Sequence, residues 1–203
     1  MGIIKVIATA LLATLALPAL AQTRLSHKAH PQGASADDRA ADALKDAESL
    51  LQKQQYPQAE EKLQTIITQQ AENPQAWFDL GFAQSHQGKN AEAITAYKKA
   101  VALDPKWFEA QQNLGLALAK SGDLAAAAST LKIAVTLKPT VGGQPALAGA
   151  WLSLAQVTEE SHPQDALAAY QKAAELDPTN PEAQLGLARM AERSGNSAAA
   201  EQQ

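Results

Sequence analysis

The side chains that most often perform chemistry are sparse in this sequence, and their positions do not favour catalysis. His27 and His30 lie three residues apart, a spacing that binds metal when the segment is helical. Their segment is polar and aperiodic, so two histidines there make at most a weak and unselective site. His86 and His162 fall at the ends of expected helices, where a cation complements the helix dipole. The histidines therefore predict neither a metal site nor a catalytic base.

Acidic and nucleophilic residues lead to the same interpretation. The carboxylate pairs Glu60-Glu61 and Glu159-Glu160 are adjacent in sequence, so their side chains diverge around a helix rather than converge on one substrate. The chain has no cysteine, which excludes thiolate catalysis, iron–sulfur clusters and disulfides. It has no phosphate-binding loop, His-Glu-x-x-His or Gly-x-Ser-x-Gly. We expect no catalytic residue, no metal and no cofactor, and hence a protein that is not an enzyme.

Composition points to a folded helical protein. Hydrophobic residues make up 46% of the 203 residues and aromatics only 4%, and alanine, the best helix former, is abundant. Lysine and arginine number 17 against 21 acidic residues, which gives a net charge of −4. This balance argues against nucleic acid or anionic lipid as the main partner.

The first 21 residues have the pattern of a secretory signal peptide. Lys5 gives a weakly positive start, residues 6–17 are almost entirely apolar, and Ala19-Leu20-Ala21 supplies small residues before a cleavage site after Ala21. We expect export to a periplasm or secretion, with no membrane insertion after cleavage. An uncleaved anchor is the alternative, although the stretch is short for a membrane span.

Residues 22–36 (QTRLSHKAHPQGASA) are polar, contain Pro31 and Gly33, and show no apolar period. This composition is typical of a flexible tether. The remaining residues, 37–203, are expected to form the folded domain.

A period of 34 residues organises that domain. Leu80-Gly81 recurs as Leu114-Gly115, and four further pairs have the same spacing: Gly88 and Gly122, Ala93 and Ala127, Ala100 and Ala134, and Pro105 and Pro139. Self-similarity at a fixed period of this length is the signature of a repeat architecture.

The repeated residues resemble the tetratricopeptide repeat. Its pattern is matched by Trp77-x-x-Leu80-Gly81 with Ala93, Tyr97, Ala100 and Pro105, and again from Trp151 to Pro178. The resemblance implies an all-α, right-handed α-solenoid of about four and a half helix-turn-helix repeats. The expected repeats are 40–73, 74–107, 108–147, 148–180 and a partial copy at 181–203.

Each repeat of this family pairs a helix A with a helix B. We expect A helices near 38–53, 74–87, 107–121, 145–160 and 181–194. The B helices are expected near 57–70, 90–103, 123–137 and 163–176, with a last turn or two near 197–203. Small residues on helix A should let the two backbones approach closely, namely Gly81, Gly115, Ala155 and Ala188.

Three departures from the family pattern are visible. The first repeat has Asp46 where Leu80 stands in the next and Ala71 where a proline would end helix B, as expected of a polar N-terminal cap. The stretch from Pro139 to Trp151 is six residues longer than the equivalent stretch from Pro105 to Gln111, which predicts an extra loop. The sequence also stops inside the fifth repeat. Either that repeat is a solvating cap or the chain is part of a longer array.

In this family helix A lines a concave groove that holds peptides or partner helices, and the resemblance implies which residues line it here. Phe78 and Phe82 are one helical turn apart and could form an exposed aromatic anchor. The alternative is that both rings pack against the first repeat. The expected partner-binding residues are Phe78, Phe82, Gln112, Asn113, Leu116, Leu152, Gln156 and Arg189; by position, Glu182 and Leu185 lie on the same face.

The groove does not match the subset of the family that grips a C-terminal carboxylate. That subset uses lysine and arginine from successive A helices, and here only Asn113 fits its pattern. Without cations a carboxylate is not neutralised. An uncharged peptide or an amphipathic helix suits the groove better.

These observations predict a non-enzymatic scaffold that binds a segment of a partner protein, in the bacterial cell envelope. Two alternatives remain open. One is a structural protein that self-associates as a homo-oligomer. The other is an accessory subunit of an envelope assembly, secretion or cytochrome-maturation complex.

Overall fold

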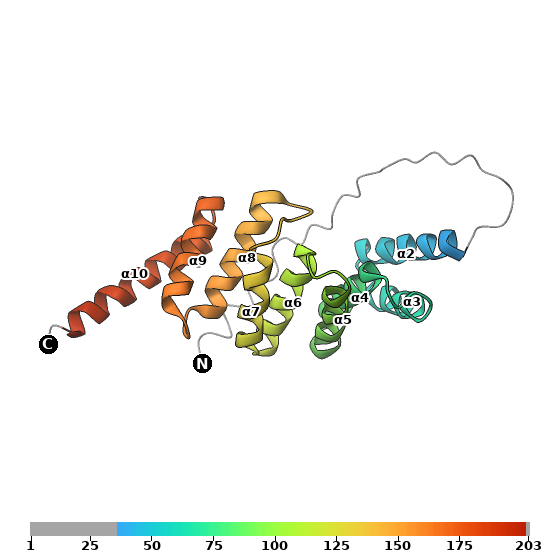
Figure 1. Ribbon diagram of the computed structural model, residues 1–203, viewed down its shortest axis with the longest axis horizontal. Helices are drawn as coiled ribbons and strands as arrows, with labels where there is room; N and C mark the ends of the chain where they lie inside the picture. Colours follow the sequence, from blue (N-terminus) through green and yellow to red (C-terminus); the bar gives the residue numbers. More distant parts are fainter. Residues whose placement is uncertain (1–35, 202–203) are drawn as a thin grey trace. The chain divides into compact units, whose positions relative to one another are not determined.

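The computed structural model describes residues 36–201, with side chains described for residues 39–195. All regular structure in this range is α-helical (Figure 1). The predicted signal peptide at 1–21 and nearly all of the predicted tether at 22–36 lie outside the described residues. Ala36, placed at the end of the tether, is instead the first residue of a helix.

The helices occur in two compact units, divided between Leu103 and Asp104. The unit formed by residues 36–103 contains α2 (Ala36–Gln52), α3 (Tyr56–Gln69), α4 (Pro74–His86) and α5 (Asn90–Leu103). The unit formed by residues 104–201 contains α6 (Phe108–Ser121), α7 (Leu124–Ala134), α8 (Gly143–Thr158), α9 (Pro163–Leu176) and α10 (Pro181–Glu201). In each unit consecutive helices pack on one another, and each A helix also contacts the next A helix. The fold is the expected all-α repeat solenoid of four to five helix pairs.

Local sequence signals explain the helix boundaries. Gly88 and Gly122 both have positive φ, at 76° and 90°, as expected for the residue that ends helix A. The side chains of Asn73 and Asp123 cap the following helices by accepting hydrogen bonds from the backbone N–H groups of Ala76 and Ala126. These caps and turns place the start of each helix within a few residues of its predicted position.

The helices approach closely where glycine leaves room. A Cβ atom at Gly81 would lie 2.7 Å from the ring of Tyr97, and one at Gly115 would lie 2.6 Å from Leu131. Both contacts join helix A to helix B of the same repeat, as predicted. In the fifth repeat the prediction was wrong: Ala188 is exposed, and the close approach occurs at Gly186, where a Cβ would lie 2.3 Å from the Tyr170 ring.

The last helix also differs from expectation. A break after residue 194 and a separate turn near 197–203 were expected, but α10 runs without interruption from Pro181 to Glu201. Gly195 alone does not end it, because a glycine inside a helix costs only about 1 kcal/mol relative to alanine.

The predicted extra loop lies between α7 and α8, and a side chain holds it. Glu109 of α6 accepts hydrogen bonds through Oε1 from the backbone N–H groups of Thr140 and Val141, at 2.8 and 3.1 Å. Helix α7 ends at Ala134, three residues earlier than expected, and α8 begins at Gly143, two residues earlier. The loop is therefore tied to the third repeat.

Candidate interaction surface

The eight residues expected to bind a partner fall into two groups. Phe82, Asn113 and Leu152 are buried, so the expectation that they line an accessible surface was wrong. Asn113 turns its amide to the backbone carbonyl of Glu109, one turn earlier in the same helix. The remaining side chains are partly exposed: Phe78, Gln112, Leu116, Gln156 and Arg189.

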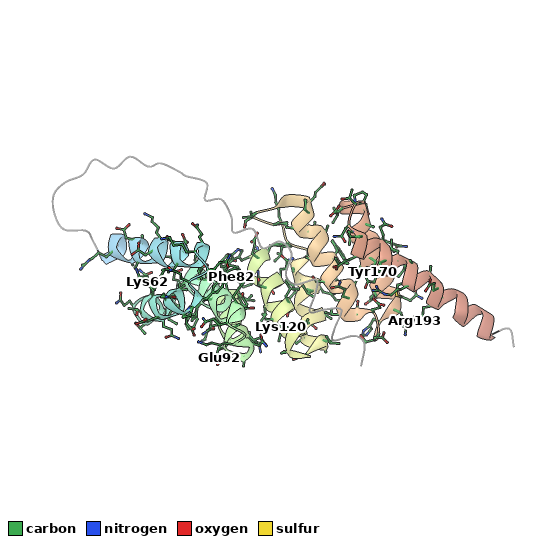
Figure 2. The ribbon with its side chains drawn as sticks, turned by 180° about the vertical axis from the view of Figure 1, so that it is seen from behind. Lys62, Phe82, Glu92, Lys120, Tyr170 and Arg193 are labelled. Atoms are coloured by element: carbon green, nitrogen blue, oxygen red, sulfur yellow. The ribbon has the colours of Figure 1, made fainter. Side chains whose placement is uncertain are left out.

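Phe82 belongs to the hydrophobic core of the 36–103 unit (Figure 2). Its side chain is 6% exposed, and its ring lies edge-on to Tyr56 of α3, with 6.3 Å between centroids. The ring of His86 lies 4.1 Å away, one turn along α4. The alternative that this ring packs against the first repeat is therefore correct for Phe82. Phe78 instead contacts Tyr97 of its own repeat, with 5.7 Å between ring centroids.

The other partly exposed residues come together on the A helices of the 104–201 unit. Gln112 and Leu116 are one turn apart on α6. The amide nitrogen of Gln112 lies beside Gly149 of α8, 3.8 Å from where a Cβ would stand there. Gln156 lies two turns after Gly149 on the same side of α8. These contacts place α6 and α8 next to each other along one face.

Helix α10 continues that face. The amide nitrogen of Gln156 donates to Glu182 Oε2 at 3.2 Å, and Arg189 of α10 donates to both carboxylate oxygens of Glu159. Between these two cross-links lies Leu185, which is 57% exposed. We call this surface the A face and define it by six residues: Gln112, Leu116, Gln156, Glu182, Leu185 and Arg189.

The charged groups beside the A face neutralise one another. Arg189 also donates to the hydroxyl of Tyr170, which itself donates to Glu159, while Arg193 donates to the backbone carbonyl of Glu159. Burial would raise the pKa of the Glu159 carboxyl, but the hydrogen bonds from Arg189 and Tyr170 outweigh it and hold that pKa below its usual value. The A face therefore offers amides, the aliphatic groups of Leu116 and Leu185 and the Glu182 carboxylate beside an internally compensated ion pair.

Leu185 is distinguished by its exposure, which the sequence period alone does not reveal. Leu185 and Ile133, at 57% and 48%, are the large hydrophobic side chains that stay exposed in the described part of the chain. Ile133 lies on α7, a B helix, whereas Leu185 lies on an A helix. Its family position placed Leu185 on the groove side, but only the structure distinguishes it from the buried Leu152.

Between residues 36 and 201, no cluster of three or more potential metal ligands occurs. Within the same range, no helix combines the length and the apolar character that crossing a bilayer requires.

Comparison with known proteins bears on the repeats. Sequence profiles of the family match three segments, described as TPR repeat at residues 86–122 and as tetratricopeptide repeat at 108–141 and 157–203. The chain is 33% identical over 72 residues to the human Superkiller complex protein 3. That match covers 36% of this chain and 5% of the human protein.

Solved structures share the fold. MamA from Desulfovibrio magneticus RS-1 (residues 41 to the end) is 23% identical, with a TM-score of 0.68 over 81% of this chain and 90% of that chain. YrrB, described as a TPR protein with an unusual peptide-binding site, is 18% identical, with a TM-score of 0.67 over 77% of this chain and 78% of that one. At these identities the likeness concerns the fold alone.

Proposed function

The chain belongs to the tetratricopeptide repeat family, and we propose that it is a non-enzymatic scaffold that binds a partner protein on its A face. The partner segment is an uncharged peptide or an amphipathic helix. The observation that carries the proposal is Leu185, a large apolar side chain left exposed between two polar cross-links that join α8 and α10. Apolar side chains surrounded by polar groups are typical of the centre of a binding site.

The electrostatics of the A face support an uncharged ligand. Arg189 is bound to Glu159, and Glu182 accepts a hydrogen bond from Gln156. An apolar side chain of the ligand, packed on Leu185, and a ligand backbone amide near Gln112 would leave both of these contacts intact. The description of YrrB as a peptide-binding TPR protein is consistent with this type of ligand.

We further propose that the protein works outside the cytoplasm, in the cell envelope. The support is the sequence pattern of residues 1–21. Export is tested by the mass of the protein recovered from cell fractions. Loss of the first 21 residues in the envelope fraction supports cleavage after Ala21, and the full-length mass in the cytoplasm contradicts export.

Binding at the A face is tested by photo-crosslinking in cells. A photoreactive residue replaces Leu185 in one strain and Ile133, the exposed apolar residue of a B helix, in the matched control. We expect Leu185 to yield a crosslinked protein that Ile133 does not. Purified Leu185→Glu should then lose affinity for that protein, while Ile133→Glu should keep it. Identical products from both positions would contradict a specific role for the A face.

Self-association remains the second candidate, and the same experiment addresses it. A crosslink from Leu185 to another copy of the chain would favour the homo-oligomer. Light scattering over a dilution series then measures the oligomeric state, and a monomer at every concentration excludes this alternative.

A further inference from the structure

The 36–103 unit contains a buried carboxyl group that the proposed binding function does not use. Asp79 of α4 is 3% exposed. Its Oδ1 accepts one hydrogen bond, from the side-chain amide of Gln75 at 2.9 Å, one turn earlier in the same helix. Its Oδ2 is buried and has no hydrogen-bond partner. An ionised carboxylate in this position would lack most of the donors that stabilise a buried charge.

Among the residues that the structure describes, no cation acts on Asp79, and Lys45 of α2 acts on Glu48 instead. The half-buried carboxylate of Glu48 on α2 repels a negative charge on Asp79. On α5, Tyr97 is fully buried, and the charge of Asp79 adds to burial in raising the pKa of its hydroxyl. On α3, Glu60 is bound by Gln84, Gln87 and Lys89. Burial, followed by repulsion from Glu48, raises the pKa of Asp79 to about 8, and the hydrogen bond from Gln75 opposes this only in part.

The repeat itself offers an independent comparison. One period of 34 residues after Asp79 the chain has Asn113, which is also buried. Asparagine has nearly the same shape as aspartic acid but cannot ionise. The equivalent position in the next repeat is therefore occupied by a permanently neutral side chain, and Asp79 can match it only in its protonated form.

We propose that Asp79 is a proton-dependent clasp of the 36–103 unit: it stays buried on α4 as a neutral acid, and its ionisation, which repels Glu48 of α2, loosens α2 from α4. Ionised Asp79 brings a second negative charge towards Glu48 across the contact between these helices. The packing of α2 on α4 is therefore more stable in acid than in base, whichever partner the A face binds.

The direction of the pH dependence follows from proton linkage. In the unfolded chain an aspartate ionises near pH 4, whereas in the folded unit it keeps its proton to about pH 8. The stabilisation is therefore complete below pH 4, falls as pH rises, and is lost above pH 8. Each pH unit in this window changes the opening equilibrium by at most about tenfold.

The first test is a carbon-13 NMR titration of the side-chain carboxyl of Asp79 in the full chain. We expect a midpoint well above pH 6, against a midpoint near or below 4 for the exposed Asp46. A midpoint near 4 for Asp79 would overturn the proposal. This measurement needs no variant, so it remains valid if a substitution prevents folding.

The second test follows hydrogen exchange of the full chain between pH 5 and 9, after correction for the intrinsic rate. Amides of α2 and α4 should lose at least tenfold protection relative to those of α8 and α9. Asp79→Asn should abolish this difference, and the surface control Asp46→Asn should keep it. If Asp79→Asn retains the full pH dependence, or if wild type shows none, the clasp does not exist.

Discussion

Asp79 of α4 in the 36–103 unit and Glu159 at the C-terminal end of α8 in the 104–201 unit are both acidic side chains shielded from solvent, Asp79 more completely. Glu159 receives hydrogen bonds from Arg189 and Tyr170, and its pKa is lowered although it is partly buried. Asp79 receives one amide hydrogen bond and no cation, and its pKa is raised. Burial opposes ionisation in both, so the number and charge of the donors decide which form is stable.

The two units also differ in how their helices are joined. In the 36–103 unit the rings of Tyr56, Phe82 and His86 pack together between α3 and α4. In the 104–201 unit the polar network of Glu159, Tyr170 and Arg189 joins α8, α9 and α10. Compensated charge is not confined to the second unit, because Gln84 and Lys89 bind the buried Glu60 of α3 in the first.

The largest effect is expected from Phe82→Ala. Removing a buried aromatic ring from a packed core costs about 3–5 kcal/mol. The 36–103 unit should lose most of its stability, measured by hydrogen exchange of α2 to α5, while α8 and α9 keep their protection. Phe78→Ala, at a partly exposed ring, should cost less. Equal losses from the two substitutions would contradict the difference in burial.

The next effect concerns the glycine beneath Tyr170. Gly186→Ala places a Cβ 2.3 Å from the ring, which must move and take its hydroxyl away from Glu159. Overpacking of this kind costs about 1–3 kcal/mol. The melting temperature should fall, whereas Gly195→Ala, with no heavy atom within 4 Å of its Cβ, should leave it unchanged or raise it. If both variants melt alike, the close approach of α9 and α10 is not rigid.

A smaller effect is expected from the ion pair itself. Arg189→Ala leaves the Glu159 carboxylate with the Tyr170 hydroxyl and the charge of Arg193, and because the guanidinium is partly exposed we expect a loss of about 1 kcal/mol. The lowered pKa of Glu159 contributes stability that is present above the pKa of an unfolded glutamate and lost as pH falls through the folded value. The difference in unfolding free energy between wild type and Arg189→Ala should therefore shrink in acid. The stabilisation by Asp79 has the opposite pH dependence. An unchanged difference at pH 3 would contradict this linkage.

The smallest effect is expected from the exposed pair of Lys62 and Asp46. Their side chains meet at 2.7 Å across α3 and α2, and the hydrogen bond from Lys62 lowers the pKa of Asp46. Surface pairs of this kind contribute little and are screened by salt. Lys62→Met should leave thermal unfolding unchanged at physiological salt. A clear loss would show that this exposed pair contributes to the stability of the 36–103 unit.

Most of the fold could be predicted because the 34-residue period repeats the same local signals. Gly88 and Gly122 mark the ends of A helices, and prolines lie at or near the starts of α3, α4, α9 and α10, where their fixed φ suits the first turn. The fifth repeat was predicted less well. Assigning its close approach to Ala188 followed the register of the other repeats, but the Tyr170 ring from the preceding helix packs on Gly186.

The candidate site was predicted only in part. Family position fixes the side of a helix on which a residue lies, but it does not fix how far neighbouring side chains bury that residue. Gln112, Gln156 and Arg189 lie on the expected face and are partly exposed. Phe82 was expected on an equivalent face, yet Tyr56 and His86 cover its ring.

By itself the sequence determined the helical class, the repeat, the turns and the poverty of catalytic groups, because these depend on residues close together along the chain. The tertiary structure decided which side chains remain accessible, where Gly186 is needed, and which carboxyl group finds a cation. Those properties depend on contacts between residues some 16 to 30 positions apart in sequence, such as Tyr170 with Gly186 and Arg189 with Glu159. No local pattern specifies such distances, because they arise only when the helices pack.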